Sequence, residues 1–193
     1  GVIAIRKDWA KAVGFELKDA YTTSELIHYA ELVKEKDPGK LGSKLVPISY
    51  TADDALTNII MANSEHSRVE SAFYKGEDGK FHWGPADPET LTGLKLMQKA
   101  YKEGLLNPEF YTWKNNEGSD NFRVKGVAAM MSLGGLASYR QDMDKNMQKN
   151  LGVSSDDLVH TAIVLGDDGK YRNLEQPNFW SALIFSPNIS KEK

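Results

Sequence analysis

The sequence predicts an α/β domain in which helices cover the faces of a mixed β-sheet. Short apolar runs typical of buried strands alternate with segments of helical periodicity, and no repeat or low-complexity stretch interrupts them. The chain of 193 residues is long enough to bury a substantial core. We therefore expect residues 1–193 to form a single domain.

The first third of the chain contains two predicted strands, at residues 2–5 and 45–49, because both are short apolar runs. A short helix is expected over 9–13. A Thr-x-x-Glu capping box predicts a longer helix over 22–36, and a similar Thr-x-x-Asp pattern predicts another over 51–62.

The middle third begins with a predicted hairpin over 71–83, built around the Asp78-Gly79 turn. Asp87 followed by proline indicates the start of a helix that runs to Gly104. Residues 107–120 are polar and irregular, which predicts a loop.

The last third is expected to contain a strand at 127–131, a helix at 137–150 and a strand at 161–165. A second Asp-Gly turn predicts that the strand at 161–165 pairs with 170–172. A final strand is expected at 182–185.

Composition narrows the possible functions. With 24 basic and 27 acidic residues the net charge is −3, and no basic stripe is present, so nucleic acid is not an expected partner. The absence of cysteine excludes disulfides, thiolate zinc sites and cysteine nucleophiles. No apolar run approaches the roughly 20 residues of a membrane span.

Catalytic and metal-binding motifs are not found. The histidines stand alone, without metal-ligand spacing, no serine occupies a Gly-x-Ser-x-Gly motif, and Gly134-Gly135 lacks the rest of a P-loop. A calcium loop over 37–48 would lack oxygen ligands at Gly39, Leu41 and Ile48. We expect no cofactor and no metal. A pair of carboxylates that meet only in space stays possible, because spacing does not reveal such pairs.

Aromatic residues at element boundaries are the candidate binding residues. Tyr50 ends a predicted strand and Trp180 precedes one. Ligands of α/β sheets collect at strand ends, where aromatic rings can stack on sugar rings. Gly134 and Gly135 follow a strand and would let a ligand approach the backbone, or form only a tight turn. For each aromatic residue the alternative is a place in the core. Further candidates are Trp9, Trp83 and Tyr139.

Several stretches, in order along most of the chain, resemble the extracellular solute-binding proteins of bacterial ABC importers. They lie at residues 5–9 (IRKDW), 22–26 (TTSEL), 35–38 (EKDP), 46–48 (VPI), 74–79, 101–110 (YKEGLLNPEF), 121–130 and 186–190. The closest pattern is that of the carbohydrate-type lipoproteins of Gram-positive bacteria. The loop at 37–44 departs from the family's calcium-binding pattern. The family's tryptophan after the strand and glycines is replaced here by Leu136 or Tyr139.

The resemblance implies a periplasmic-binding-protein-like lobe with a mixed sheet flanked by helices, the second lobe of a two-lobed protein. We interpret two further features as signs of one lobe taken from a longer protein. The first strand begins at residue 1, and Ser190 looks like the N-cap of an unfinished helix. The implied function is capture of a sugar or oligosaccharide between the lobes, without bond chemistry, and its delivery to the permease subunits. The full-length protein would be an extracellular lipoprotein, anchored to the membrane by lipid.

For the ligand site we expect Arg6 to bind hydroxyl groups, Tyr50 and Trp180 to stack, and the backbone of Gly134 and Gly135 to donate N–H groups. The alternatives are a carbohydrate-active hydrolase that uses a carboxylate pair, and a structural interaction domain.

Overall fold

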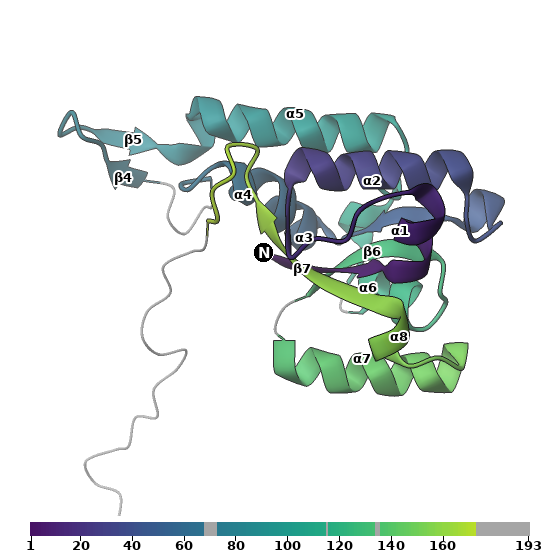
Figure 1. Ribbon diagram of the computed structural model, residues 1–193. Helices are drawn as coiled ribbons and strands as arrows, with labels where there is room; N and C mark the ends of the chain where they lie inside the picture. The colour runs from purple at the N-terminus through teal and green to yellow at the C-terminus, as the bar shows by residue number, and fades with distance from the viewer. Residues whose placement is uncertain (68–72, 115, 134–135, 173–193) are drawn as a thin grey trace, which may run out of the picture.

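A five-stranded mixed sheet forms the centre of the computed structural model, which describes residues 1–67, 73–114, 116–133 and 136–172 (Figure 1). The strand order is β2 (Ala20–Thr22), β7 (Val159–Leu165), β1 (Val2–Arg6), β6 (Ala128–Leu133), β3 (Val46–Ser49). The central strand β1 is antiparallel to both neighbours, whereas β2 is parallel to β7 and β3 is parallel to β6. The predicted mixed sheet is confirmed.

Both neighbours of β1 come from later in the chain. Val2 lies opposite Leu133 of β6 on one side and Ile163 of β7 on the other. Later strands thus supply both partners of the first strand, because the chain returns twice to the centre of the sheet.

Helices cover the two faces of the sheet (Figure 1). Their bounds are α1 Lys7–Val13, α2 Thr23–Lys36, α3 Ala52–Ala55, α4 Met61–Asn63, α5 Pro88–Lys102, α6 Glu117–Arg123, α7 Leu136–Leu151 and α8 Ser155–Leu158. Helices α1, α2, α3 and α5 pack in one hydrophobic cluster with Ile3, Ile5 and Ile48 of the sheet. Helices α6 and α7 contribute to a second cluster with Ala4 and Met131, whose side chains point to the opposite face. No helix in the described ranges is both long and apolar enough to span a membrane.

Helix α2 begins as the sequence predicts. The Thr22 hydroxyl accepts the Glu25 N–H at 3.2 Å, and the Glu25 carboxylate accepts the Thr22 N–H at 2.8 Å, which completes the capping box. Tyr29, Ala30 and Val33 are fully buried on the core-facing side.

The helical run after β3 contains a π-helical turn, Leu56–Ile60, between α3 and α4. Helix α5 packs directly on this turn. A Cβ atom added at Gly93 of α5 would lie only 2.6 Å from Ile60 Cα, so the close approach of the two backbones requires glycine here.

The hairpin is confirmed as β4 (Phe73–Lys75) and β5 (Phe81–Trp83). The strand expected at 170–172 is not formed, although the Asp-Gly turn before it is. Arg172 instead donates two hydrogen bonds to the Asp168 carboxylate, at 2.9 and 2.7 Å, and one to the Ala62 carbonyl at 3.1 Å. The strand expected at 182–185 and the helix start at Ser190 lie outside the described residues.

Candidate functional site

The carboxyl ends of four strands meet at one end of the sheet, together with the start of β1. The registers place Thr22 of β2 beside Leu165 of β7, Ser49 of β3 beside Met131 of β6, and Val2 of β1 opposite Leu133. We call this end the strand-end edge. Ligand sites of open α/β sheets form outside the carboxyl ends of strands, so it is the first place to examine.

Asn58 lies on the π-helical turn, and its buried side chain reaches toward the strand-end edge. Its amide nitrogen donates to the Asp54 carbonyl at 3.0 Å and to Ser132 Oγ at 2.9 Å. Its Oδ1 atom is the one buried side-chain polar atom in the described ranges without a hydrogen-bond partner. A buried acceptor left unpaired is costly, and π-helical turns recur at functional sites.

A second polar group joins α2 to the end of β7. The Asn63 amide nitrogen donates to Thr23 Oγ1 at 2.9 Å, and its Oδ1 accepts the Asp167 N–H at 2.8 Å. The Asp167 carboxylate in turn accepts the Thr23 hydroxyl at 2.7 Å. The Asp167 carboxylate also accepts the Ser24 N–H at 2.9 Å, and Thr22 Oγ1 accepts the Glu25 N–H, so these N–H groups at the start of α2 are not presented to a ligand.

The end of β3 is fixed to α6 by hydroxyl and amide groups. Ser49 Oγ donates to the Gly118 carbonyl at 2.6 Å and accepts the Asn121 amide N–H at 3.1 Å. Together with Asn58 and Ser132, these side chains place neutral hydrogen-bonding groups at the strand-end edge, beside the carboxylates of Asp54 and Asp167. Such groups suit the recognition of hydroxyl-bearing ligands.

Tyr50 directly follows β3 at the strand-end edge, but its ring is turned into the core and is only 2% exposed. Its hydroxyl contacts the Met130 sulfur at 3.8 Å, and burial raises its pKa. The ring is thus not presented for stacking. Gly134 and Gly135 follow β6, which ends at this edge, but they and Trp180 lie outside the described residues.

Arg6 lies at the other end of the sheet, because it ends β1, which runs antiparallel to β6. Its guanidinium donates to both carboxylate oxygens of Asp8, at 2.8 and 2.6 Å, and lies 4.5 Å from the centre of the Trp9 ring. The structure does not bring Arg6 and Tyr50 together, which corrects the expectation that they line one site.

The further aromatic candidates are also dispersed. Trp9 is buried beside Arg6, and Trp83 is exposed on the β4–β5 hairpin. The side chain of Tyr139 lies outside what the structure describes.

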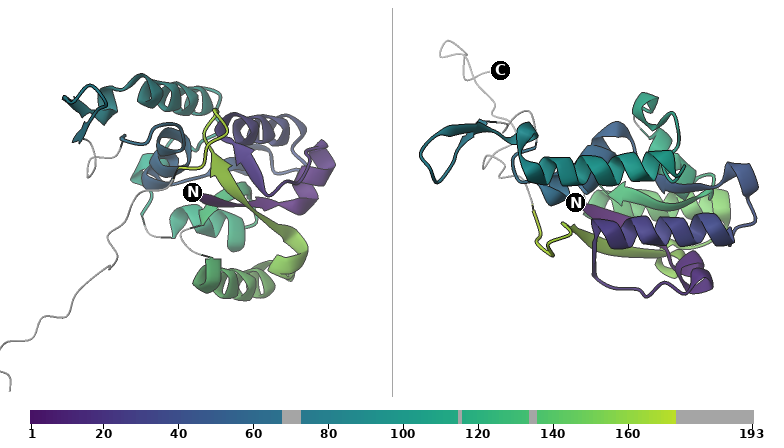
Figure 2. Two further views of the ribbon diagram at one scale, coloured as in Figure 1. Left: turned by 60° about the vertical axis from the view of Figure 1, so that its left-hand side comes forward. Right: turned by 90° about the horizontal axis from the view of Figure 1, so that it is seen from above.

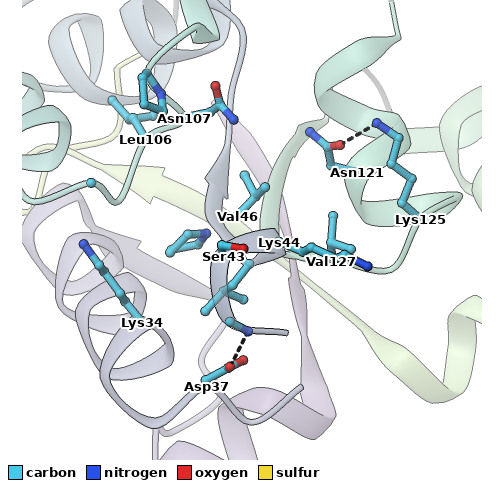
Figure 3. Close-up of a pocket in the computed structure, with 15 residues that line it drawn as sticks. Lys34, Asp37, Ser43, Lys44, Val46, Leu106, Asn107, Asn121, Lys125 and Val127 are labelled. Atoms are coloured by element: carbon cyan, nitrogen blue, oxygen red, sulfur yellow. Dashed lines mark hydrogen bonds between the residues drawn. The ribbon is translucent and has the colours of Figure 1, made fainter. Parts of the chain in front are cut away.

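A hollow of about 710 Å³ opens at the Arg6 end of the sheet, beside the starts of β3 and β6 (Figure 3). Its lining includes Val46, Leu106 and Val127, with Lys34, Lys44 and Lys125 around them. Lys34 donates to the Glu103 carbonyl and Lys125 to Asn121 Oδ1 at 3.0 Å. The hollow thus lies at the starts of β3 and β6, and Asn121 connects it to the strand-end edge through Ser49.

The loop expected to lack calcium ligands borders this hollow. The Asp37 carboxylate accepts the backbone N–H groups of Leu41 and Gly42, at 2.9 and 2.7 Å. Its oxygens thus stabilise the turn of the loop itself. No cluster of three or more His, Cys, Asp or Glu side chains suited to a metal occurs in the described part of the chain.

The sequence missed Asn58, Asn63 and Ser132 as candidate residues. A usable signal was present for Asn58, which interrupts the apolar residues of the helix predicted over 51–62, and Asn63 directly follows that helix. Buried amides at such positions need partners and so mark a polar site.

No known family profile and no curated protein matches the sequence. Solved structures match in fold. The S. pneumoniae ABC-transporter substrate-binding protein FusA in complex with kestose is 18% identical with a TM-score of 0.63, and the match covers 90% of this chain and 33% of that one. An Agrobacterium vitis S4 ABC-transporter solute-binding protein with bound D-mannitol is 17% identical with a TM-score of 0.60, covering 86% and 36%.

Maltose-bound MalE3 of T. maritima is 15% identical with a TM-score of 0.60, and the match covers 88% of this chain and 39% of that one. The chain thus spans between 33% and 39% of the length of these matched structures. It has the α/β fold of part of an ABC-transporter solute-binding protein.

Proposed function

We propose that the chain is one lobe of a solute-binding protein that captures a sugar or oligosaccharide for a bacterial ABC importer. The observation that carries the proposal is the fold match, which extends over 86–90% of this chain in structures solved with kestose or D-mannitol. The neutral hydrogen-bonding groups of the strand-end edge support it, because sugars are uncharged and rich in hydroxyl groups.

In this proposal the ligand lies against the strand-end edge. Ser132 Oγ, which the buried Asn58 amide holds in place at 2.9 Å, offers a hydrogen bond to a sugar hydroxyl, and Gly134 and Gly135 donate backbone N–H groups. Trp180 remains a stacking candidate. Arg6 is not retained, since it lies at the far end of the sheet.

The mechanism is capture without bond chemistry. A ligand that contacts two lobes only when they are closed shifts an open-to-closed equilibrium toward the closed form. The closed form then delivers the solute to the permease subunits. The full-length protein would work outside the cytoplasmic membrane, held at the surface of a Gram-positive cell by a lipid anchor.

The test is calorimetry of this chain with kestose, maltose, laminaribiose and D-mannitol. Because one lobe supplies only part of the contacts, we expect saturable but weak binding, with a Kd on the order of 1 mM. Ser132→Ala should weaken it several-fold, whereas Ser43→Ala, beside the hollow at the other end, should leave it unchanged. Nanomolar binding by the chain alone would contradict the half-site, and release of reducing sugar would indicate a hydrolase.

A further inference from the structure

One face of the β4–β5 hairpin carries large exposed aromatic side chains. Phe73 pairs with Trp83 across the strands and Lys75 pairs with Phe81, so these four side chains share a face. Phe73, Phe81 and Trp83 are 73%, 78% and 53% exposed. We call Phe73, Phe81 and Trp83 the hairpin aromatic face.

The opposite face of the hairpin holds it to the body of the protein. The Tyr74 ring stacks on His66 with 3.7 Å between centroids, and its hydroxyl donates to Asp87 Oδ2 at 2.8 Å. His82, opposite Tyr74, contacts the Asp78 carboxylate at 2.9 Å. A two-stranded hairpin is marginal by itself, and here the stabilising contacts lie on this side. The hairpin aromatic face contributes little to them.

The composition around the hairpin aromatic face indicates the chemistry of its partner. The turn beyond it reads Gly-Glu-Asp-Gly-Lys from Gly76 to Lys80, and no Leu, Ile, Val or Met occurs between Phe73 and Trp83. Protein interfaces are enriched in Met and Arg as well as in aromatic residues and are depleted of Lys, Glu and Asp, whereas this stretch contains two Lys, one Glu and one Asp and neither Met nor Arg. Aromatic rings among charged groups instead suit sugars, whose C–H faces stack on the negative ring faces while their hydroxyls bind the polar neighbours.

The base of the hairpin joins the strand-end edge through hydrogen bonds. The Gly84 carbonyl, directly after β5, accepts the Thr90 hydroxyl at 2.8 Å, and Thr90 Oγ1 contacts Ser64 Oγ at 2.8 Å. The adjacent Asn63 accepts the Asp167 N–H at the end of β7. The N-terminus and the hairpin accordingly lie toward the same end of the sheet, from which the hairpin projects (Figures 1 and 2).

We propose that the hairpin aromatic face is an outer stacking surface for a sugar chain whose inner end occupies the strand-end edge. The inference rests on the proposed function and specifies its ligand class as an oligosaccharide. Phe81 and Trp83 are two residues apart on one strand, about 7 Å, and Phe73 lies about 5 Å across from Trp83. The rings therefore form a surface longer than a single pyranose ring.

The experiment compares short and long ligands of one series on the 193-residue chain. Maltose and maltohexaose, and separately kestose and a longer inulin-type fructan, are titrated while amide and aromatic NMR signals are recorded. The variants are Phe73→Ala/Phe81→Ala and Trp83→Ala. The control is Tyr111→Ala, which removes a ring that is 63% exposed but lies outside the hairpin.

We expect the long ligand to shift signals of Phe81 and Trp83 as well as those of the strand-end edge. The double variant should weaken binding of the long ligand about tenfold, with the short ligand and the Tyr111→Ala control unchanged. Circular dichroism of each variant checks that the fold is retained, as expected for exposed side chains.

Other results separate the failure of the inference from that of the proposed function. If the long ligand binds and shifts only the strand-end edge, the hairpin surface is wrong and the proposed function stands. If no glycan of the panel binds, both are overturned. A dimer in sedimentation that the double variant dissolves would assign the hairpin aromatic face to a second copy of the chain and overturn the inference.

Discussion

Ser24 binds both carboxylate oxygens of Asp167, through its backbone N–H at 2.9 Å and its hydroxyl at 2.6 Å. The contact joins the turn after β7 to the first turn of α2, two segments far apart in the sequence. A carboxylate at this position also faces the positive end of the helix dipole. It fixes one side of the strand-end edge.

Asp167→Ala should lower the free energy of unfolding by about 2 kcal/mol, because Ser24 and Thr23 lose their acceptor and the helix loses a favourable charge. Urea unfolding followed by circular dichroism measures this change. Glu77→Ala, which removes an exposed carboxylate in the hairpin turn, is the control and should change stability by less than about 0.5 kcal/mol. If the two substitutions changed the free energy of unfolding equally, the Asp167 contacts would not contribute to stability.

Stability should fall in acid partly through Glu25. The Lys18 ammonium and then the Thr22 N–H lower the pKa of the Glu25 carboxyl below its ordinary value. The unfolded chain therefore takes up the proton first, so the stabilisation is present above the ordinary pKa of about 4.5 and is lost as pH falls through the lower folded value.

The measurement for Glu25 is the Tm from about pH 6 to about pH 3. Glu25→Gln keeps a side-chain acceptor for the capping box but removes the titration, so its Tm should depend less steeply on pH in this range. The pKa values of the Glu31 and Asp168 carboxyls are also lowered. The Tm of the variant should therefore still depend on pH, but less steeply. A variant curve parallel to the unmodified one would contradict the role of Glu25.

Gly93→Ala should destabilise the protein although alanine favours helix by about 1 kcal/mol. The added methyl group would lie 2.6 Å from Ile60 Cα, so α5 has to move away from the π-helical turn. We expect a net loss of about 1–3 kcal/mol. Thr92→Ala, at an exposed position of the same helix, gains propensity without the clash and should be neutral or stabilising in the same unfolding assay.

Tyr50 can be tested as a core residue against its predicted stacking role. Tyr50→Phe removes only a weak contact with the Met130 sulfur, so stability should change by less than about 1 kcal/mol and sugar affinity should not change. Tyr50→Ala should cost about 3–5 kcal/mol through the cavity it leaves. If Tyr50→Phe lost sugar binding but kept its stability, the Tyr50 hydroxyl would have to contact the ligand.

Local signals in the sequence predicted most elements of the fold. The capping box of Thr22 and Glu25 located α2, and the Asp78-Gly79 turn located the hairpin. Strand β2 was missed because it has only three residues, the last of which is the N-cap Thr22. Helix α6 was missed because it is polar, and its Asn121 is buried through hydrogen bonds rather than by apolar contacts.

The site was less accessible to sequence reasoning, because it depends on which ends of which strands meet. Tyr50 was correctly placed at a strand end, but the pattern did not show that its ring turns inward. Arg6 also follows a buried strand, yet β1 runs antiparallel to its neighbours, so its carboxyl end lies at the opposite edge. The antiparallel direction of β1 becomes evident only from the pairing of Val2 with Leu133 and Ile163.

The central position of β1 has a consequence for the order of folding. The strand precedes the other described elements in the sequence, yet it pairs with β6 and β7, which are among the last of them. Contacts between such distant segments require the closure of long loops and slow the folding of a domain. During synthesis on the ribosome, β1 therefore lacks its two neighbouring strands until β7 emerges. The sheet accordingly forms late and as a unit.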